Sequence, residues 1–177
     1  MDIADITTFQ CTRRYRTSVN LVYLVYNIAM RETCPVVTFD FDGTIKRHGF
    51  DPEDGCFTRD CGLDPHALQC IRMFANEGMS VHIVTSRRTS TRSEVEEFVV
   101  LNNLSQFISG IHFTDGKLKK ATLARLGSMK HFDDDPTEIE ALPNDIMGIL
   151  WRSGHLDENN KVCDPDDPRF HFDNWNN

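Results

Sequence analysis

The most informative segment of this chain runs from Pro35 to Thr44 and reads Pro-Val-Val-Thr-Phe-Asp-Phe-Asp-Gly-Thr. Its β-branched and aromatic residues favour a short, buried strand. The strand ends in two carboxylates one residue apart, Asp40 and Asp42, and Gly43 then permits a tight turn. We therefore predict a buried strand whose carboxyl end presents two acids to a turn.

Outward from this stretch, strand-like and helix-like segments alternate. Asp64 and Pro65 have the residue types of a helix N-cap and first helical position. The pattern predicts strands at 81–85, 107–113, 129–133 and 146–151, and helices at 65–78, 90–104, 119–126 and 136–142. Such alternation is typical of an α/β fold with a central parallel sheet, whose ligand site lies beyond the carboxyl ends of the strands.

The chain has 177 residues, of which 40% are hydrophobic, so it can bury one core but not two ordinary ones. We predict three parts: an N-terminal helical extension at 1–34, a core domain at 35–151 and a polar C-terminal tail at 152–177. In the first part, hydrophobic residues recur at helical spacing from Leu21 to Ile28. That helix would pack on the domain or form a homodimer.

Composition limits the partners and the compartment. The net charge is −8 and the basic residues form no long run, so a general electrostatic attraction to nucleic acid is not favoured. The apolar run at 19–30 is shorter than the ~20 residues of a membrane span, so we expect no membrane contact. The six cysteines accompany no convincing secretion signal, which indicates reduced thiols and a cytoplasmic protein.

Three predicted strands end in groups that suit phosphoryl transfer. Asp40 and Asp42 follow the first strand, and Thr85-Ser86-Arg87 follows the next, where it offers a hydroxyl and nearby backbone amides to phosphate oxygens. The strand at 129–133 ends in Asp133-Asp134-Asp135, an acidic group that would repel itself unless a hard cation lay among its oxygens. Asp135 can instead cap the helix that begins at Pro136. These ends converge on one crevice in a parallel sheet, which predicts a metal-dependent site.

The segment from Val36 to Ile45, Val-Val-Thr-Phe-Asp-Phe-Asp-Gly-Thr-Ile, resembles the first signature motif of the haloacid dehalogenase superfamily. A strand-terminal threonine, a lysine before a helix and a strand-terminal acidic pair follow in the order and spacing of the other motifs. The resemblance covers roughly 35–151. It implies a Rossmann-like, three-layer fold and a magnesium-dependent phosphatase, a hydrolase that works through an aspartyl phosphate.

The resemblance also implies roles for individual residues. Asp40 would be the nucleophile and Asp42 the general acid and then the general base. Thr85 would hold a phosphoryl oxygen, and Lys119 resembles the family's lysine best, with Lys117 and Lys120 as rivals. Mg²⁺ would be held by Asp40, the backbone carbonyl of Asp42 and Asp133, with Asp134 as second choice among the acids. Candidate substrate contacts are Gly43, Thr44, Ser86, Arg87 and Lys117, with Arg47, His48, Arg88 and Arg92 around them.

The sequence leaves the substrate class undecided. The segment 45–64 has the length of a short loop, and 87–117 is filled by one helix and one strand, so neither position has room for a cap domain. An open site would tolerate bulky phosphomonoesters, including nucleotides, a nucleic-acid 3′ end or a phosphoprotein. Among substrates we favour a small phosphorylated metabolite, in particular a nucleotide. The alternatives are a polynucleotide 3′-phosphatase, which the acidic net charge disfavours, and a non-catalytic module that binds a phosphorylated ligand.

A second cluster lies outside the family motifs. His66 and Cys70 would share a helix face, and Cys56 and Cys61 precede them. A zinc site on the loop over the active site would use these four residues. Their spacing matches no standard zinc finger, so buried or idle cysteines are the default interpretation.

Overall fold

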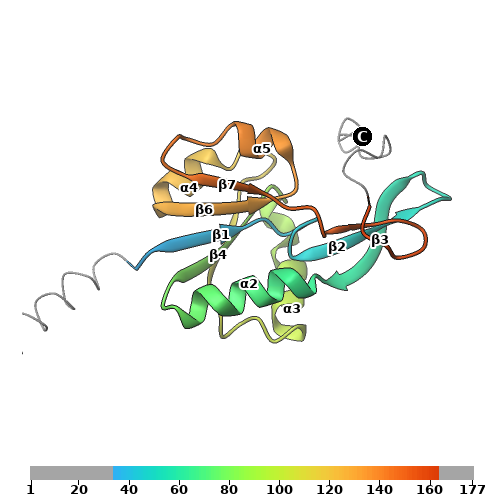
Figure 1. The fold of residues 1–177 in the computed structure, drawn as a ribbon, viewed down its shortest axis with the longest axis horizontal. Helices are drawn as coiled ribbons and strands as arrows, with labels where there is room; N and C mark the ends of the chain where they lie inside the picture. The colour runs from blue at the N-terminus through green and yellow to red at the C-terminus, as the bar shows by residue number, and fades with distance from the viewer. Residues whose placement is uncertain (1–33, 164–177) are drawn as a thin grey trace, which may run out of the picture. The chain divides into compact units, whose positions relative to one another are not determined.

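The computed structural model describes residues 34–163, and its centre is a five-stranded parallel sheet (Figure 1). The strand order is β5-β4-β1-β6-β7, so the strand that ends at Asp40 lies in the middle, between β4 and β6. The strands are β1 (Val36–Phe39), β4 (Ser80–Thr85), β5 (Ile108–Phe113), β6 (Ser128–Asp133) and β7 (Met147–Leu150). All five were predicted from the sequence.

Helices cover both faces of this sheet. One face is covered by α2 (Pro65–Asn76) and by α3 (Arg92–Leu101), which follows a 3₁₀ turn, η1 (Thr89–Thr91). The other face is covered by α4 (Lys120–Leu126) and α5 (Pro136–Glu140) (Figure 1). The prediction of a Rossmann-like, three-layer α/β fold is therefore confirmed.

Two of these helices begin with the same local chemistry. An aspartate precedes a proline at the first helical position, and its carboxylate accepts hydrogen bonds from backbone N–H groups of the first turn. Asp64 does so at the start of α2, with 2.7 Å to the amide of His66, and Asp135 does so at the start of α5, with 2.8 Å to the amide of Thr137. Asp135 is therefore a helix cap.

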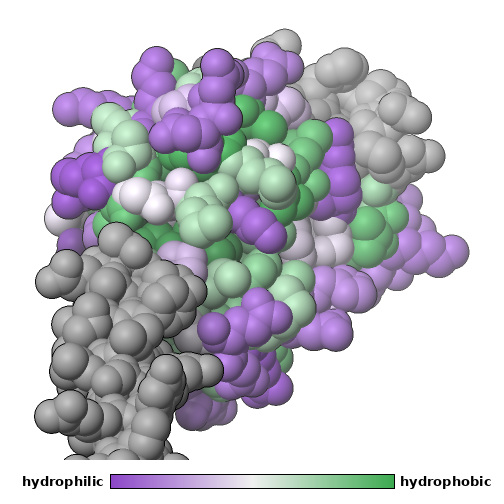
Figure 2. Space-filling view, turned by 60° about the vertical axis from the view of Figure 1, so that its left-hand side comes forward, coloured by the Kyte–Doolittle hydropathy of each residue, from purple (hydrophilic) through white to green (hydrophobic). Residues whose placement is uncertain are grey.

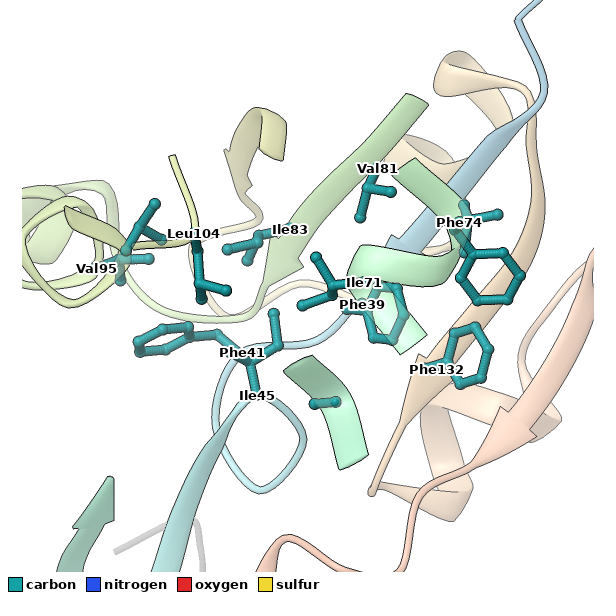
Figure 3. Close-up of a cluster of buried hydrophobic side chains, with 13 residues drawn as sticks. Phe39, Phe41, Ile45, Ile71, Phe74, Val81, Ile83, Val95, Leu104 and Phe132 are labelled. Carbon is teal, nitrogen blue, oxygen red and sulfur yellow. The ribbon is translucent and has the colours of Figure 1, made fainter. Parts of the chain in front are cut away.

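The main core lies between the sheet and the layer formed by α2 and α3 (Figure 3). Phe39 of β1 stacks on Phe132 of β6 with 4.4 Å between ring centroids, and both rings pack against Phe74 of α2. Burying a side chain of this size stabilises the fold by about 1.5–3 kcal/mol. Because Phe39 and Phe132 are anchored in this way, the acids that follow them on β1 and β6 start from fixed positions.

A second, smaller sheet lies beyond the carboxyl end of β1 (Figure 1). In it, β2 (Lys46–Asp51) pairs antiparallel with β3 (Cys56–Leu63) and parallel with β8 (His155–Leu156). The interpretation of 45–64 as a loop was wrong. Charged residues and glycines interrupt the alternation of apolar and polar residues in the hairpin, and its strand pairing contains register shifts. Its sequence therefore lacks the period of two that marks a strand.

Several predictions fall on residues that the structure does not describe. The N-terminal helix, and a homodimer through it, lie outside 34–163. The division of the chain at 34/35 and 151/152 stays a prediction. Over the described range, no helix is long and apolar enough to cross a membrane. With the beginning of β1 turned forward, the surface shows hydrophobic residues interspersed among hydrophilic ones (Figure 2).

Candidate functional site

The site is built on the carboxyl ends of β1 and β6 and on the residue that precedes α4. Asp40 follows β1 directly, and its backbone N–H donates to the carbonyl of Phe132, 2.8 Å away, on the neighbouring strand β6. Asp133 is the last residue of β6, and Asp134 follows it. Lys119 is the N-cap residue of α4. The sheet therefore brings together acids that are 93 residues apart in the chain.

Lys119 joins two of these acids. Its Nζ lies 2.7 Å from Asp40 Oδ1 and 2.7 Å from Asp133 Oδ2, and all three side chains are at most 6% exposed. Its backbone N–H donates to Glu138 on α5, 3.0 Å away, which fixes the start of α4. The rivals Lys117 and Lys120 are exposed. Of the three lysines, Lys119 is the one that reaches the acids.

Asp134 completes a cluster of carboxylates with Asp40 and Asp133. One oxygen from each of these residues can be chosen so that all three lie within 4.8 Å of one another, and all three residues are buried. Among residues 34–163, this is the group of histidine, cysteine or acidic side chains with the geometry of a metal site. Cys56, Cys61, His66 and Cys70 do not form such a group, and the cysteines of this range are free thiols.

Burial makes the cluster electrostatically costly. It raises the pKa of Asp40 to about 8, against the opposing attraction of Lys119 and with the help of the charge on Asp133. It also raises the pKa of Asp134 well above its usual value. On Asp133, burial is outweighed by a hydrogen bond from His131 and by the charge of Lys119, so that its pKa is lowered. One ammonium does not compensate three buried carboxylates.

The donor set fits a hard divalent cation. Carboxylate oxygens are the ligands that Mg²⁺ prefers, and three of them with one lysine leave a formal charge of −2 when all are ionised. A cation among these oxygens would compensate their buried negative charge and so oppose the effect of burial, which raises the pKa of Asp40. The residues that would hold it are Asp40, Asp133 and Asp134, together with the backbone carbonyl of Asp42 that the family resemblance implies.

Asp42 lies in the turn after β1 and is held by two basic side chains. Arg87 donates two hydrogen bonds to its carboxylate, from Nε to Oδ2 at 2.6 Å and from Nη2 to Oδ1 at 2.8 Å. His48, on β2, lies 3.0 Å from Oδ1 through its Nε2. Although burial alone would raise the pKa of Asp42, these hydrogen bonds outweigh it and hold the pKa well below its usual range. Asp42 is therefore ionised in the ligand-free protein.

The remaining predicted contacts lie around this turn. Thr85 ends β4 fully buried, and its Oγ1 accepts a hydrogen bond from the amide of Arg87 at 3.2 Å. Thr44 is also buried, and its hydroxyl donates to Asp134 Oδ1 at 3.4 Å rather than pointing to solvent. Ser86 and Lys117 are exposed.

Gly43 has a positive φ of +70°, a conformation that favours glycine. A Cβ there would overlap the carboxylate of Asp134 and lie 2.7 Å from His155 Cε1. A residue with a side chain would therefore displace the acid cluster.

Two histidines beside the cluster were not predicted from the sequence. His131 contacts Asp133 from the same strand, with 2.8 Å between Nε2 and Oδ2. Its spacing, two residues before the acid on a strand, could have predicted that both side chains share a face. His155 Nε2 lies 3.6 Å from Asp134 Oδ2. No sequence signal indicates His155, because it lies on a two-residue strand, β8, within a polar segment.

Comparisons with known proteins leave the chain without an assigned family. No family model matches its sequence, and no curated protein does. Among solved structures, the chain is similar to part of the Pnkp1/Rnl/Hen1 RNA repair complex, with a TM-score of 0.49 and 16% sequence identity. The alignment covers 66% of this chain and 42% of that chain, so this chain spans less than half of its length. The function must therefore be argued from the site itself.

Proposed function

We propose that this chain is a magnesium-dependent phosphomonoester hydrolase of the haloacid dehalogenase superfamily, with Asp40 as nucleophile. The observation behind the proposal is the contact of Lys119 with both Asp40 and Asp133 at 2.7 Å in a buried cluster that also includes Asp134. A nucleophilic carboxylate, a lysine and two further acids are the groups that the family resemblance implies. They meet at the carboxyl ends of the strands.

In the first step, a carboxylate oxygen of Asp40 attacks phosphorus, and the bond between phosphorus and the ester oxygen breaks. Lys119, bonded to Asp40 Oδ1, offsets negative charge while an anion approaches a carboxylate. A bound divalent cation would add charge compensation at the same place. The products are an aspartyl phosphate on Asp40 and an alcohol, whose oxygen receives a proton from Asp42.

In the second step, water attacks the aspartyl phosphate, and Asp42 takes a proton from that water. The Asp40 carboxylate is restored and inorganic phosphate leaves. Asp42 can act as an acid only after its contacts with Arg87 loosen, since they stabilise the ionised form. A phosphate dianion competes for the same guanidinium. We therefore assign Arg87 to substrate binding, as an arginine that changes partner when substrate arrives.

The substrate that we propose is a nucleotide or another small phosphorylated metabolite. The hairpin β2–β3 lies next to the turn after β1 and is too small to be a separate cap domain. His48 and Arg87 place basic groups at the acid, where a phosphate group would be bound. The negative net charge gives no support for long-range attraction to a polynucleotide.

The test is phosphate release from nucleotides, sugar phosphates, a phosphopeptide and a 3′-phosphorylated oligonucleotide, each with Mg²⁺ and with chelator. We expect Mg²⁺-dependent release from a nucleotide or sugar phosphate, and none from Asp40→Asn, a variant that keeps the size of the side chain. Preference for the oligonucleotide, with steep loss of activity in salt, would favour a polynucleotide 3′-phosphatase. No release from any substrate by folded protein would favour a binding module.

A further inference from the structure

His131 lies beneath the acid cluster, within the sheet. Its side chain is fully buried and is directed to the face of the sheet opposite to that of its neighbour Phe132, as expected for consecutive strand residues. Its Nε2 lies 2.8 Å from Asp133 Oδ2, and its Nδ1 lies 2.9 Å from Thr38 Oγ1 on β1. The imidazole therefore bridges the central strand and an acid of the proposed metal site.

The direction of these hydrogen bonds follows from the groups involved. An ionised Asp133 can only accept, so His131 Nε2 donates to it. In a neutral ring Nδ1 is then an acceptor, and the hydroxyl of Thr38, which also lies 3.1 Å from the carbonyl oxygen of Lys130, can donate to it. The hydroxyl of Ser128 lies 2.9 Å from Thr38 Oγ1 and 2.9 Å from the carbonyl oxygen of Lys130, and it can donate to either. The result is a chain of hydrogen bonds that runs from Ser128 through Thr38 and His131 to Asp133.

The acceptor positions of Asp133 are largely used by the protein. Its Oδ2 accepts from Lys119 Nζ at 2.7 Å and from His131 Nε2 at 2.8 Å, and its Oδ1 accepts from the backbone N–H of Asp135 at 3.0 Å. A carboxylate has about four acceptor positions, two on each oxygen. The three donors thus fix the plane of the carboxylate and leave one position on Oδ1 for a further partner.

We infer that His131, held by Thr38, is a positioning residue that fixes the Asp133 carboxylate for the divalent cation. This rests on the proposed function, in which Asp133 is a metal ligand. Mutation of a residue that hydrogen-bonds to a metal ligand commonly lowers metal affinity by about 10–100-fold. Here the group is a histidine locked on both ring nitrogens, and its hydroxyl partner lies on the same strand that presents the nucleophile.

A matched control lies on the neighbouring strand. His82 on β4 is the register partner of Thr38, directly beside it in the sheet. Its ring bonds to Ser80 and to His112, at 3.2 and 3.1 Å, and has no contact with the acid cluster. Substitution of His82 removes an imidazole from the same sheet without changing the surroundings of Asp133.

The experiment measures the binding of Mn²⁺ to the full chain by electron paramagnetic resonance, together with the melting temperature in chelator. The variants are His131→Leu, His131→Gln, Thr38→Val and the control His82→Leu. His131→Gln keeps a donor near the position of Nε2, and Thr38→Val keeps the shape of the side chain but removes its hydroxyl. We expect the Kd for Mn²⁺ to rise at least 10-fold in His131→Leu and about 3-fold in Thr38→Val.

We also expect His131→Gln to stay within about 3-fold of wild type, and His82→Leu within about 2-fold. A purely structural role would lower the melting temperature and leave the Kd of the folded protein unchanged, which would overturn the inference. If His131→Leu does not fold, Thr38→Val with an unchanged Kd overturns it instead. Wild-type protein that binds no Mn²⁺ also overturns it. Mn²⁺ binding that depends on His131, without any hydrolysis, would refute the proposed function alone.

Discussion

At the scale of single residues, the proposed nucleophile and the proposed general acid have opposite electrostatic environments. Asp40 and Asp42 are two positions apart, yet burial raises the pKa of Asp40 to about 8. For Asp42, the opposing effect of hydrogen bonds from His48 and Arg87 is larger than that of burial, and its pKa is lowered. Without a cation, Asp40 is thus protonated up to a higher pH than usual while Asp42 is ionised, the reverse of what the proposed mechanism requires. In the proposed mechanism, binding of metal and substrate must therefore lower the pKa of Asp40 and raise that of Asp42.

The first prediction concerns the stability of the metal-free protein. A carboxyl whose pKa is higher in the folded state than its ordinary 3.8 favours folding at low pH, and this contribution is lost as pH rises toward about 8. Asp40→Asn has no such charge to bury. In chelator, we expect Asp40→Asn to gain about 2 kcal/mol in free energy of unfolding relative to wild type between pH 6 and pH 8.5, measured by urea unfolding.

The control for this measurement is Asp145→Asn, which removes an exposed carboxylate. Its difference from wild type should stay constant across the same pH range. A stability difference between Asp40→Asn and wild type that does not change with pH would contradict the prediction.

The second prediction concerns the clamp on Asp42. Arg87→Met keeps much of the aliphatic volume and removes both hydrogen bonds from the guanidinium. We expect the pKa of Asp42 to rise by about 1–3 units, followed through its ¹³C carboxyl resonance in metal-free protein. Arg92→Met is the matched control, because Arg92 bonds to Glu96 instead. An unchanged titration of Asp42 in Arg87→Met would show that the clamp has no effect.

At the scale of elements, the short strand β8 closes the small sheet against the turn after β1. The carbonyl of Gly154, just before β8, accepts from the amide of His48 at 2.8 Å. A Cβ on Gly154 would overlap the carbonyl group of Gly43. Backbone therefore lies directly against backbone at the turn that presents Asp42, and only glycine permits this approach.

The third prediction follows from that contact. Gly154→Ala must push β8 away from the turn, which costs about 1–3 kcal/mol of stability by the usual measure of overpacking. Because Gly43 also borders the Asp134 carboxylate, we expect weaker Mn²⁺ binding as well. Urea unfolding and Mn²⁺ titration measure the two effects. Asn159→Ala, an exposed site in the same segment, should behave as wild type, and Gly154→Ala should not.

At the scale of the whole molecule, binding of the proposed cation would be coupled to folding. The ligands come from β1 and β6, and Lys119 precedes a helix that follows β5, so the complete cluster exists only in the folded chain. A cation that binds the folded state alone stabilises it by about 2.7 kcal/mol at a concentration of 100 times its Kd. For a domain of this size, we expect a rise in melting temperature of about 10 °C in Mg²⁺ relative to chelator.

Asp133→Asn is the informative variant for this fourth prediction. It keeps the shape of the side chain but removes one charge from the proposed ligand set, so its melting temperature should change little on addition of Mg²⁺. A wild-type melting temperature that is the same in Mg²⁺ and in chelator would contradict the metal site. A shift in wild type that Asp133→Asn retains would move the site away from these acids.

Secondary structure can be predicted from the sequence wherever the hydrophobic periodicity is regular and helix-capping residues are present. Buried strands such as β1 and β4 are rich in hydrophobic side chains, and the aspartate-proline pairs at Asp64 and Asp135 mark helix starts. The parallel topology followed from the alternation of elements, and with it the edge of the sheet at which the acids gather. The hairpin β2–β3 was missed because its pairing depends on a partner strand rather than on a local period.

Short-range sequence pattern predicted the α/β class, the succession of strands and helices in the central domain apart from the β2–β3 hairpin, and the strand ends that bear Asp40, Asp42 and Asp133. Tertiary structure alone decided which of three neighbouring lysines reaches the acids. It also decided that Arg87 and His48 hold Asp42, and that His131 and His155 border the cluster. Such pairings join residues brought together by burial and strand register, and neither property is encoded in the spacing of residues along the chain.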